Sequence, residues 1–179
     1  MSQGVISPPG LVYFANNIPG SGIDAPVTDE AGTRIGPAYR AQLYDGLALG
    51  SLKPLLPSTT FRSGNGLGYL IPRYIEVPDL PPGSVGLFMV RAYNEMDWES
   101  SNIRGESNIL RLQTGGGGII PPTELVGLQP FQVLPVPEPE TIALFGFGLI
   151  SFGLWRRRRV GVFLKRPSYA PHERTAVRD

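Results

Sequence analysis

Residues 85–93 read Val-Gly-Leu-Phe-Met-Val-Arg-Ala-Tyr and are apolar on both faces of an extended chain as far as Val90. Turn residues precede this run, with Pro81-Pro82-Gly83 shortly before it. A short run that is apolar on both faces and bounded by turn residues is typical of a strand covered on both sides. The sequence therefore predicts a strand here, in the middle of a β-sandwich.

Shorter runs of the same kind lie on both sides. We expect strands at residues 11–14, 38–44, 69–77 and 107–113, the last with Leu110 and Leu112 facing inward. Pro72 interrupts the third run, which favours an edge strand or a bulge because proline cannot donate to a neighbouring strand. Five or more short strands between Pro/Gly turns predict an all-β fold, a small antiparallel β-sandwich.

Residues 77–114 also resemble a known family. They contain a Leu80-Pro81-Pro82-Gly83 corner, the Val-Arg-Ala-Tyr-Asn end of the central run and a Gly105-Glu106-Ser107 turn before a last strand. This order resembles the final three strands of fibronectin type III domains and covers about a fifth of the chain. The resemblance implies an immunoglobulin- or fibronectin III-like sandwich for residues 1–114.

Composition changes at Gly115. Four glycines are followed by Ile119-Ile120-Pro121-Pro122, and the chain has 23 glycines and 19 prolines in all. Glycines make a segment flexible and paired prolines stiffen it. We therefore expect residues 115–135 to be a Gly/Pro-rich linker outside the sandwich.

Residues 136–159 combine four features in order. Residues 136–139, Val-Pro-Glu-Pro, should be extended because proline disfavours helix at its own and the preceding position. Thr141 can cap a helix that continues through fourteen uncharged residues, 142–155, to Arg156. Such a helix is about 21 Å long, short of the roughly 30 Å of a bilayer core, but snorkelling arginines and bilayer thinning can make up the difference. The arginine cluster, residues 156–159, predicts a cytoplasmic end.

A Pro-Glu-Pro motif, a short transmembrane helix and an arginine-rich end resemble the PEP-CTERM sorting signal. The resemblance implies a Gram-negative bacterial protein that passes through the inner membrane to the cell envelope or the medium. It implies an exosortase, a membrane protease, as partner, with Pro137, Glu138 and Pro139 as the recognition element. The membrane-retention element would be Arg156, Arg157, Arg158 and Arg159. A plain single-pass anchor and a buried soluble helix are the alternatives, and residues 160–179 form a basic tail beyond the arginines.

Charge is unevenly distributed. Residues 1–134 carry 8 basic and 11 acidic side chains, and residues 135–179 carry 8 basic and 4 acidic ones. A basic C-terminal segment suits an anionic membrane surface, so the lipid bilayer is a predicted partner. The body lacks a basic stripe, which argues against nucleic acid.

The first 17 residues contain no Lys or Arg and no apolar run of the length that a secretory signal peptide needs. Residues 2–6 resemble the start of a mature chain. Two explanations stay open: a leader that these residues do not include, and a chain that is not exported.

Residue types argue against catalysis. The chain has no cysteine, and its one histidine, His172, lies beyond the arginine cluster. This removes Ser-His-Asp, Cys-His and His-ligated metal sites from the body, although a carboxylate-only glycosidase remains conceivable. Gly64-Asn65-Gly66-Leu67-Gly68 lacks the spacing and lysine of a phosphate loop and is interpreted as a turn. We expect no enzyme, no cofactor and no metal.

Two binding alternatives remain for the body. Acidic residues after the central run could bind calcium, together with two asparagines nearby: Glu95, Asp97, Glu99, Glu106, Asn94 and Asn102. Tyr93 and Trp98 could stack on a sugar ring, or Trp98 could close its loop against the sandwich. The leading hypothesis is a non-catalytic exported envelope or matrix protein. The alternative is a carbohydrate-binding module on the same anchor, with exopolysaccharide as its partner.

Overall fold

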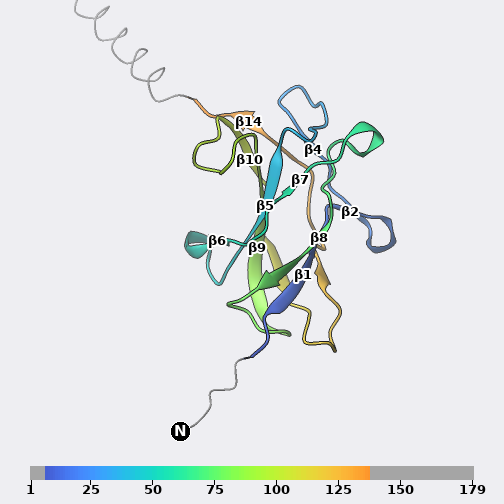
Figure 1. Cartoon of the computed structure of the whole chain (residues 1–179), viewed down its shortest axis with the longest axis vertical. Helices are drawn as coiled ribbons and strands as arrows, with labels where there is room; N and C mark the ends of the chain where they lie inside the picture. Colours follow the sequence, from blue (N-terminus) through green and yellow to red (C-terminus); the bar gives the residue numbers. More distant parts are fainter. Residues whose placement is uncertain (1–6, 138–179) are drawn as a thin grey trace, which may run out of the picture. The chain divides into compact units, whose positions relative to one another are not determined.

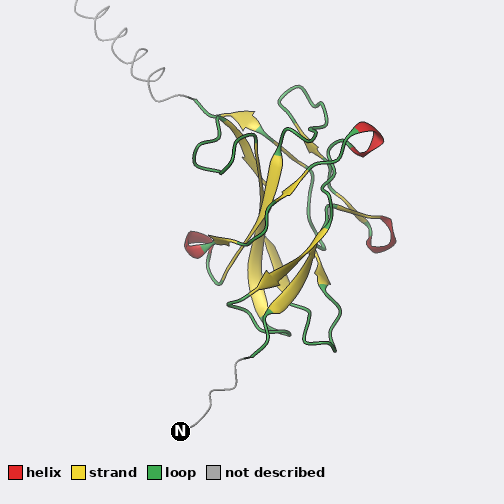
Figure 2. Ribbon diagram, viewed as in Figure 1, coloured by secondary structure: helices red, strands yellow, loops and turns green. Residues whose placement is uncertain are grey.

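The computed structural model describes residues 7–137; residues 1–6 and 138–179 lie outside the description. Its regular structure is almost entirely β, with three short 3-10 turns (Figure 2). The predicted all-β class is thus confirmed. The 3-10 turns are Pro19–Ser21, Leu49–Ser51 and Gly64–Gly66. The strands are β1 Gly10–Phe14, β2 Asn17–Ile18, β3 Ile23–Asp24, β4 Val27–Thr28, β5 Arg40–Gly46, β6 Lys53–Pro54, β7 Thr59–Thr60, β8 Arg73–Val77, β9 Val85–Tyr93, β10 Ile103–Glu106, β11 Leu110–Gln113, β12 Thr123–Glu124, β13 Phe131–Gln132 and β14 Leu134–Pro135.

The larger sheet is built around β9. Its strand order is β14-β10-β9-β5-β6, with β11 also pairing with β9 and β7 with β5. β5 and β9 run antiparallel and side by side through the middle of the unit, from the Arg40–Tyr93 pair to the Gly46–Leu87 pair (Figure 1). The residues predicted as a central strand are therefore the centre of the sheet, with the same bounds.

The smaller sheet has the order β12-β1-β8, with β1 antiparallel to β8 and parallel to β12. β8 pairs only with β1, so it is an edge strand, as Pro72 predicted. Proline just before the first residue of an edge strand removes no ladder hydrogen bond.

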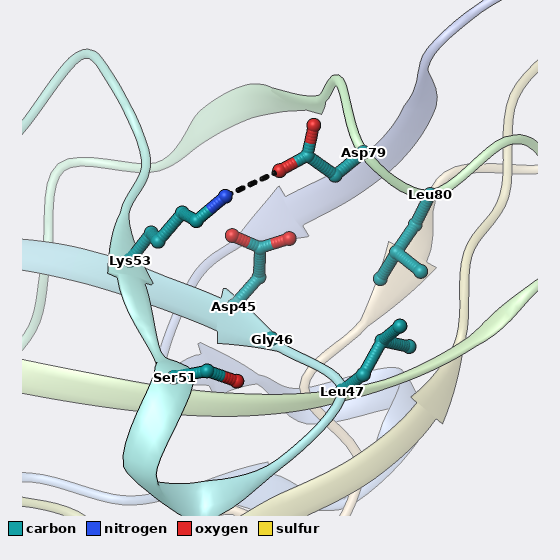
Figure 3. A pocket seen from close by; sticks show the side chains of 7 residues that line it. All are labelled: Asp45, Gly46, Leu47, Ser51, Lys53, Asp79 and Leu80. Atoms are coloured by element: carbon teal, nitrogen blue, oxygen red, sulfur yellow. Dashed lines mark hydrogen bonds and ion pairs between the residues drawn. The ribbon is translucent and has the colours of Figure 1, made fainter.

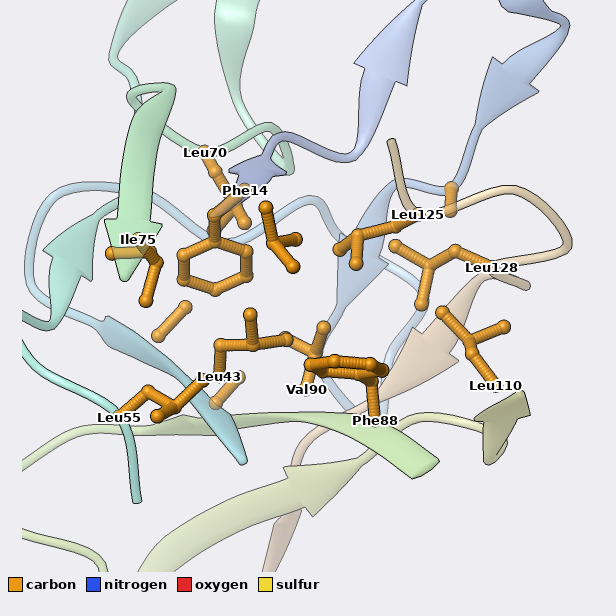
Figure 4. Close-up of a cluster of buried hydrophobic side chains, with 14 of the residues drawn as sticks. Phe14, Leu43, Leu55, Leu70, Ile75, Phe88, Val90, Leu110, Leu125 and Leu128 are labelled. Carbon is orange, nitrogen blue, oxygen red and sulfur yellow. The ribbon is translucent and has the colours of Figure 1, made fainter. Parts of the chain in front are cut away.

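One hydrophobic core lies between these sheets. Phe14 and Ile75 come from the smaller sheet and are fully buried, and Figure 4 shows them pointing toward Leu43 and Phe88 of the larger one. Alternate residues of β5 and β9 supply this face because successive side chains of a strand point to opposite sides. Leu110 of β11 joins the same core, and Leu112 packs against it.

The Gly105-Glu106-Ser107 segment is not a turn before the last strand, as predicted. Glu106 pairs with Arg91, and Leu110 pairs with Phe88. Between these two pairs, residues 107–109 therefore lie opposite only residues 89–90 of β9. The extra residue makes a β-bulge between β10 and β11. The Ser107 backbone N–H donates to the Val90 carbonyl, while the Ser107 hydroxyl accepts from the Val90 N–H, both at 2.9 Å. One strand with a bulge thus replaces the predicted turn.

Residues 115–135 belong to the folded unit rather than to a linker beside it. Positive φ angles at Gly116, Gly117 and Gly118 turn the chain back. It then forms β12 against β1, β13 against β4 and β14 against β10. Leu125 and Val133 are fully buried, and Leu128 is nearly so. The compact unit ends at Val136.

Proline did not keep this stretch outside the unit because its strands are only two residues long and lie at sheet edges. Pro135 itself stands in β14, an outer strand of the larger sheet. Proline is tolerated there because an edge strand has one side without partners. Within residues 7–137, no helix is long and apolar enough to span a bilayer. The predicted membrane helix, residues 141–155, lies outside the described residues.

Candidate functional site

Trp98 folds back onto the outer face of the larger sheet. The guanidinium group of Arg91 lies 4.5 Å from the centre of the Trp98 ring, and that of Arg104 lies 4.9 Å away. Arg91 also lies 4.4 Å from the Tyr44 ring and forms a 2.8 Å ion pair with Glu106. Cation–π contacts of this kind stabilise a ring by roughly 0.5–2 kcal/mol. The loop is therefore closed onto the sheet through its tryptophan.

Tyr93 lies beneath this tryptophan. Only 2% of Tyr93 is exposed, and its ring meets Trp98 edge to face at 6.4 Å. Its hydroxyl donates to the Gln42 side-chain oxygen at 3.1 Å, and burial raises the pKa of the phenol. A sugar ring needs an open aromatic face, so Tyr93 does not offer the stacking surface proposed from the sequence. The two rings are brought together, but they contact each other and two arginines.

The acidic residues of this loop do not converge. The Asp97 carboxylate accepts hydrogen bonds from the Ser100 N–H and hydroxyl at 2.8 and 2.7 Å, and these bonds lower its pKa. Asn94 donates to the Asn102 side chain at 2.8 Å, and Glu106 is held by Arg91. No three acidic or histidine side chains among residues 7–137 gather to hold a metal ion. Among the described residues, the acidic side chains considered as calcium ligands therefore do not gather around one point.

A hollow of about 180 Å³ opens where β5 ends, near β6 and the corner after β8 (Figure 3). Asp45 lies in its wall and is only 4% exposed, while Lys53 and Asp79 form a 3.1 Å ion pair at its rim. Burial, and then the nearby Asp79 charge, raise the pKa of Asp45; the Lys53 charge and a hydrogen bond from the Asp45 backbone lower it without cancelling the rise. The remaining lining comes from Gly46, Leu47, Ser51 and Leu80.

Sequence reasoning missed this hollow. Asp45 follows an alternating run and precedes Gly46, which reads as an ordinary strand end. The hollow could be recognised only from the register of β5 and β6, which places Asp45 directly opposite Lys53. A second, more open hollow of about 400 Å³ lies beside β14, lined by Asp29, Glu30, Ala31, Tyr39, Ile103, Val133 and Pro135.

The chain leaves the folded unit through β14. Leu134 pairs with Arg104 and Pro135 with Ile103, and the Val136 N–H donates to the Asn102 carbonyl at 2.8 Å. Figure 1 shows β14 and the start of β1 at opposite ends of the unit. Pro137 is exposed and is the last described residue.

Residues 135–159 match the family model of the PEP-CTERM protein-sorting motif. A PEP-CTERM motif implies processing by exosortase, a membrane enzyme, and is consistent with secretion through the membrane to the cell envelope. No curated protein and no solved structure matches the chain. The predicted PEP-CTERM resemblance is confirmed, and the match starts one residue before the predicted signal, inside β14.

The residues matched by the PEP-CTERM model include all the predicted sorting residues. Of the recognition element, Pro137 is described, one residue beyond the last hydrogen bond of the folded unit. Glu138, Pro139 and the cluster Arg156, Arg157, Arg158 and Arg159 lie within the matched residues but outside the described ones. The matched segment therefore overlaps the last strand, and its Pro137 lies two residues after that strand ends at Pro135.

Proposed function

We propose that this chain is an exported, non-catalytic protein of the cell envelope or extracellular matrix of a Gram-negative bacterium, delivered by its PEP-CTERM segment. The observation that carries the proposal is the match over residues 135–159, which begins in the last strand of a folded β unit. A sorting motif at the end of a complete unit can be removed or anchored without disturbing the core.

The membrane-embedded part of the proposal rests on residues 142–155 and the arginines after them. This run inserts as a single helix, and the positive-inside rule keeps residues 156–159 on the cytoplasmic side. The folded unit then lies on the other side during transit. Pro137, Glu138 and Pro139 present an extended, solvated segment to an exosortase-type protease.

The folded unit acts by binding or as a structural element. The chain contains no cysteine, and its one histidine is His172, so the unit has neither a thiol nor an imidazole for nucleophilic or general-base catalysis. Its architecture suits this role. The antiparallel pairing of β1 with β8, and the order β10-β9-β5-β6 within the larger sheet, support an immunoglobulin- or fibronectin III-like sandwich, to which β12 and β14 are additional edge strands.

Membrane association tests the anchor. Carbonate-washed membranes should retain the full-length chain, whereas a chain ending at Val136 keeps the whole folded unit and should be soluble. If both chains stay in the soluble fraction, the insertion claim is wrong.

Processing tests the motif. In a host that has an exosortase, Glu138→Gln removes the charge and keeps the shape, so uncleaved precursor should accumulate on a blot. Glu140→Gln is the matched control, because it removes a neighbouring charge outside Pro137-Glu138-Pro139 and should be processed normally. Normal processing of Glu138→Gln would show that its carboxylate is not the recognised group.

A further inference from the structure

The hollow beside Asp45 has the features of a binding site that the sorting function does not use. It lies within the folded unit, at the end of β5, and holds about 180 Å³. In Figure 3 the Asp45 carboxylate points toward the space between Lys53 and Asp79, while Leu47 and Leu80 form an apolar side. A volume of this size accommodates several water molecules or the end of one long side chain.

Asp45 is almost fully buried and forms no ion pair within the described residues. Only 4% of the residue is exposed, yet its carboxylate forms none of the side-chain hydrogen bonds or ion pairs found among residues 7–137. Buried charges are normally paired because desolvation costs several kcal/mol. The raised pKa of Asp45 agrees with this geometry, since burial and Asp79 outweigh Lys53. The carboxylate faces the hollow, and among the described residues no cationic group lies within ion-pair distance of it.

Lys53 is not the ion-pair partner of Asp45. Its ammonium group pairs with Asp79 at 3.1 Å, and both side chains are largely exposed, at 72% and 69%. Two carboxylates and one ammonium leave the site one negative charge in excess. An exposed ion pair of this kind is weak, so Lys53 can move aside for an incoming group.

The walls select the class of cation. A calcium ion takes six to eight oxygen ligands, whereas only two carboxylates line this hollow and the Ser51 hydroxyl donates to the Ala48 carbonyl. Leu47, 76% exposed at the mouth, and buried Leu80 instead suit an aliphatic stem. We propose that this hollow binds a lysine-type alkylammonium group of a partner protein, with Asp45 holding the ammonium and Leu47 and Leu80 contacting the stem.

The test uses the purified full-length chain in non-ionic micelles, with aspartate carboxyl carbons labelled for NMR. The probe is n-butylammonium chloride; n-butanol and sodium chloride are the controls. The Asp45 carboxyl resonance should shift saturably with butylammonium and with neither control. Binding is measured by the broadening of the butylammonium methylene proton resonances. Asp45→Asn should weaken this binding at least tenfold. Asp29→Asn, in the other hollow, should bind as the wild type does.

Two further variants keep the test decisive. Asp79→Asn changes an exposed side chain, so it should fold, and losing one of two negative charges should weaken binding several-fold. Lys53→Ala removes the competing ammonium and should strengthen binding. A parallel titration uses calcium chloride. Equal shifts with butanol, a stronger response to calcium chloride than to butylammonium, or unchanged affinity in Asp79→Asn would each overturn the proposal. The experiment needs no processing enzyme, so its outcome is independent of the sorting function.

Discussion

Residues 85–113 and residues 115–136 contribute to the same core by different means. In the first region, β9 exchanges hydrogen bonds with β5 over seven residue pairs and with β10 and β11 on its other side. The second region has three strands of two residues each, and they pair with three different partners, β1, β4 and β10. Its buried side chains are isolated rather than arranged in a row.

The folded unit is therefore more vulnerable to substitution in residues 115–136 than in residues 85–113. A long ladder is redundant, because neighbouring pairs hold the register when one contact is weakened. The second region depends on single side chains, each of which closes the core at a separate place. It also has little hydrogen-bonded structure of its own to retain if those side chains are lost.

Removing the second region should have the largest effect. A chain ending at Gly118 lacks Leu125, Leu128 and Val133, which are at most 7% exposed. Burial of each such side chain contributes roughly 1.5–3 kcal/mol, so their sum approaches the lower end of the 5–15 kcal/mol typical of a whole domain. We expect no cooperative thermal transition by circular dichroism, whereas a chain ending at Val136 should melt cooperatively. Equal melting temperatures of the two chains would show that residues 119–136 are not needed for the stability of the fold.

A single buried leucine of this region should come next. Leu125 is fully buried, and Leu125→Ala should lower the free energy of unfolding by about 2–5 kcal/mol, measured by urea denaturation. Its neighbour Val126 is 58% exposed, and Val126→Ala should stay within about 0.5 kcal/mol. If the two variants lose the same stability, the region is not held by isolated contacts.

The contrast between the regions also explains which parts of the fold the sequence could predict. Alternation and two-sided apolarity found β1, β5, β8, β9 and β11 because those strands repeat a period-two pattern. Leu125, Leu128 and Val133 show no period, since each faces the core from a separate short segment. The sequence predicts that a flexible stretch starts at Gly115, but the chain folds back here, and a β-carbon on Gly115 would meet the Pro121 carbonyl.

The candidate sites also differ in whether their residues are contiguous in the sequence. The sorting motif is contiguous in sequence, so its order of parts was sufficient to predict it. The hollow at Asp45 depends on the pairing with Lys53 and on the corner that brings Asp79 nearby, neither of which the sequence specifies locally. The spacing of Tyr93 and Trp98 likewise could not show that the tryptophan covers the tyrosine.

Gly105 marks the place where the two regions touch. A β-carbon there would meet the Gln132 carbonyl and lie 3.0 Å from the Val133 Cα. Gly105→Ala should therefore push residues 132–133 away and cost about 1–3 kcal/mol of unfolding free energy. Gly50→Ala is the control, since nothing lies within 4 Å of its added carbon, and it should change stability by less than about 0.5 kcal/mol. A neutral Gly105→Ala would mean that the second region adjusts freely to the first.

The smallest expected effect concerns the loop between β9 and β10, residues 94–102, which contacts the second region. Its residue Asn102 accepts a hydrogen bond from the Val136 N–H, and Asp97 holds the loop's turn through the Ser100 N–H and hydroxyl. These bonds lower the pKa of Asp97 in the folded chain. A carboxylate of this kind stabilises the fold above its unfolded pKa, about 3.9 for aspartate, and that stability is lost as the pH falls through the lower folded value.

Asp97→Asn should accordingly lower the melting temperature slightly at pH 7, and its difference from the wild type should shrink as the pH is lowered from 5 toward 2.5. The effect stays small because the carboxylate is exposed and solvent screens it. Glu95→Gln removes another exposed charge of the same loop without removing the Ser100 bonds, so its difference from the wild type should not follow this course. Melting curves of the three chains across this pH range make the comparison. If the difference in melting temperature between the wild type and Asp97→Asn grew in acid, its sign would contradict a lowered pKa of Asp97. The hydrogen bonds between Asp97 and Ser100 would then not be what holds the loop against Val136.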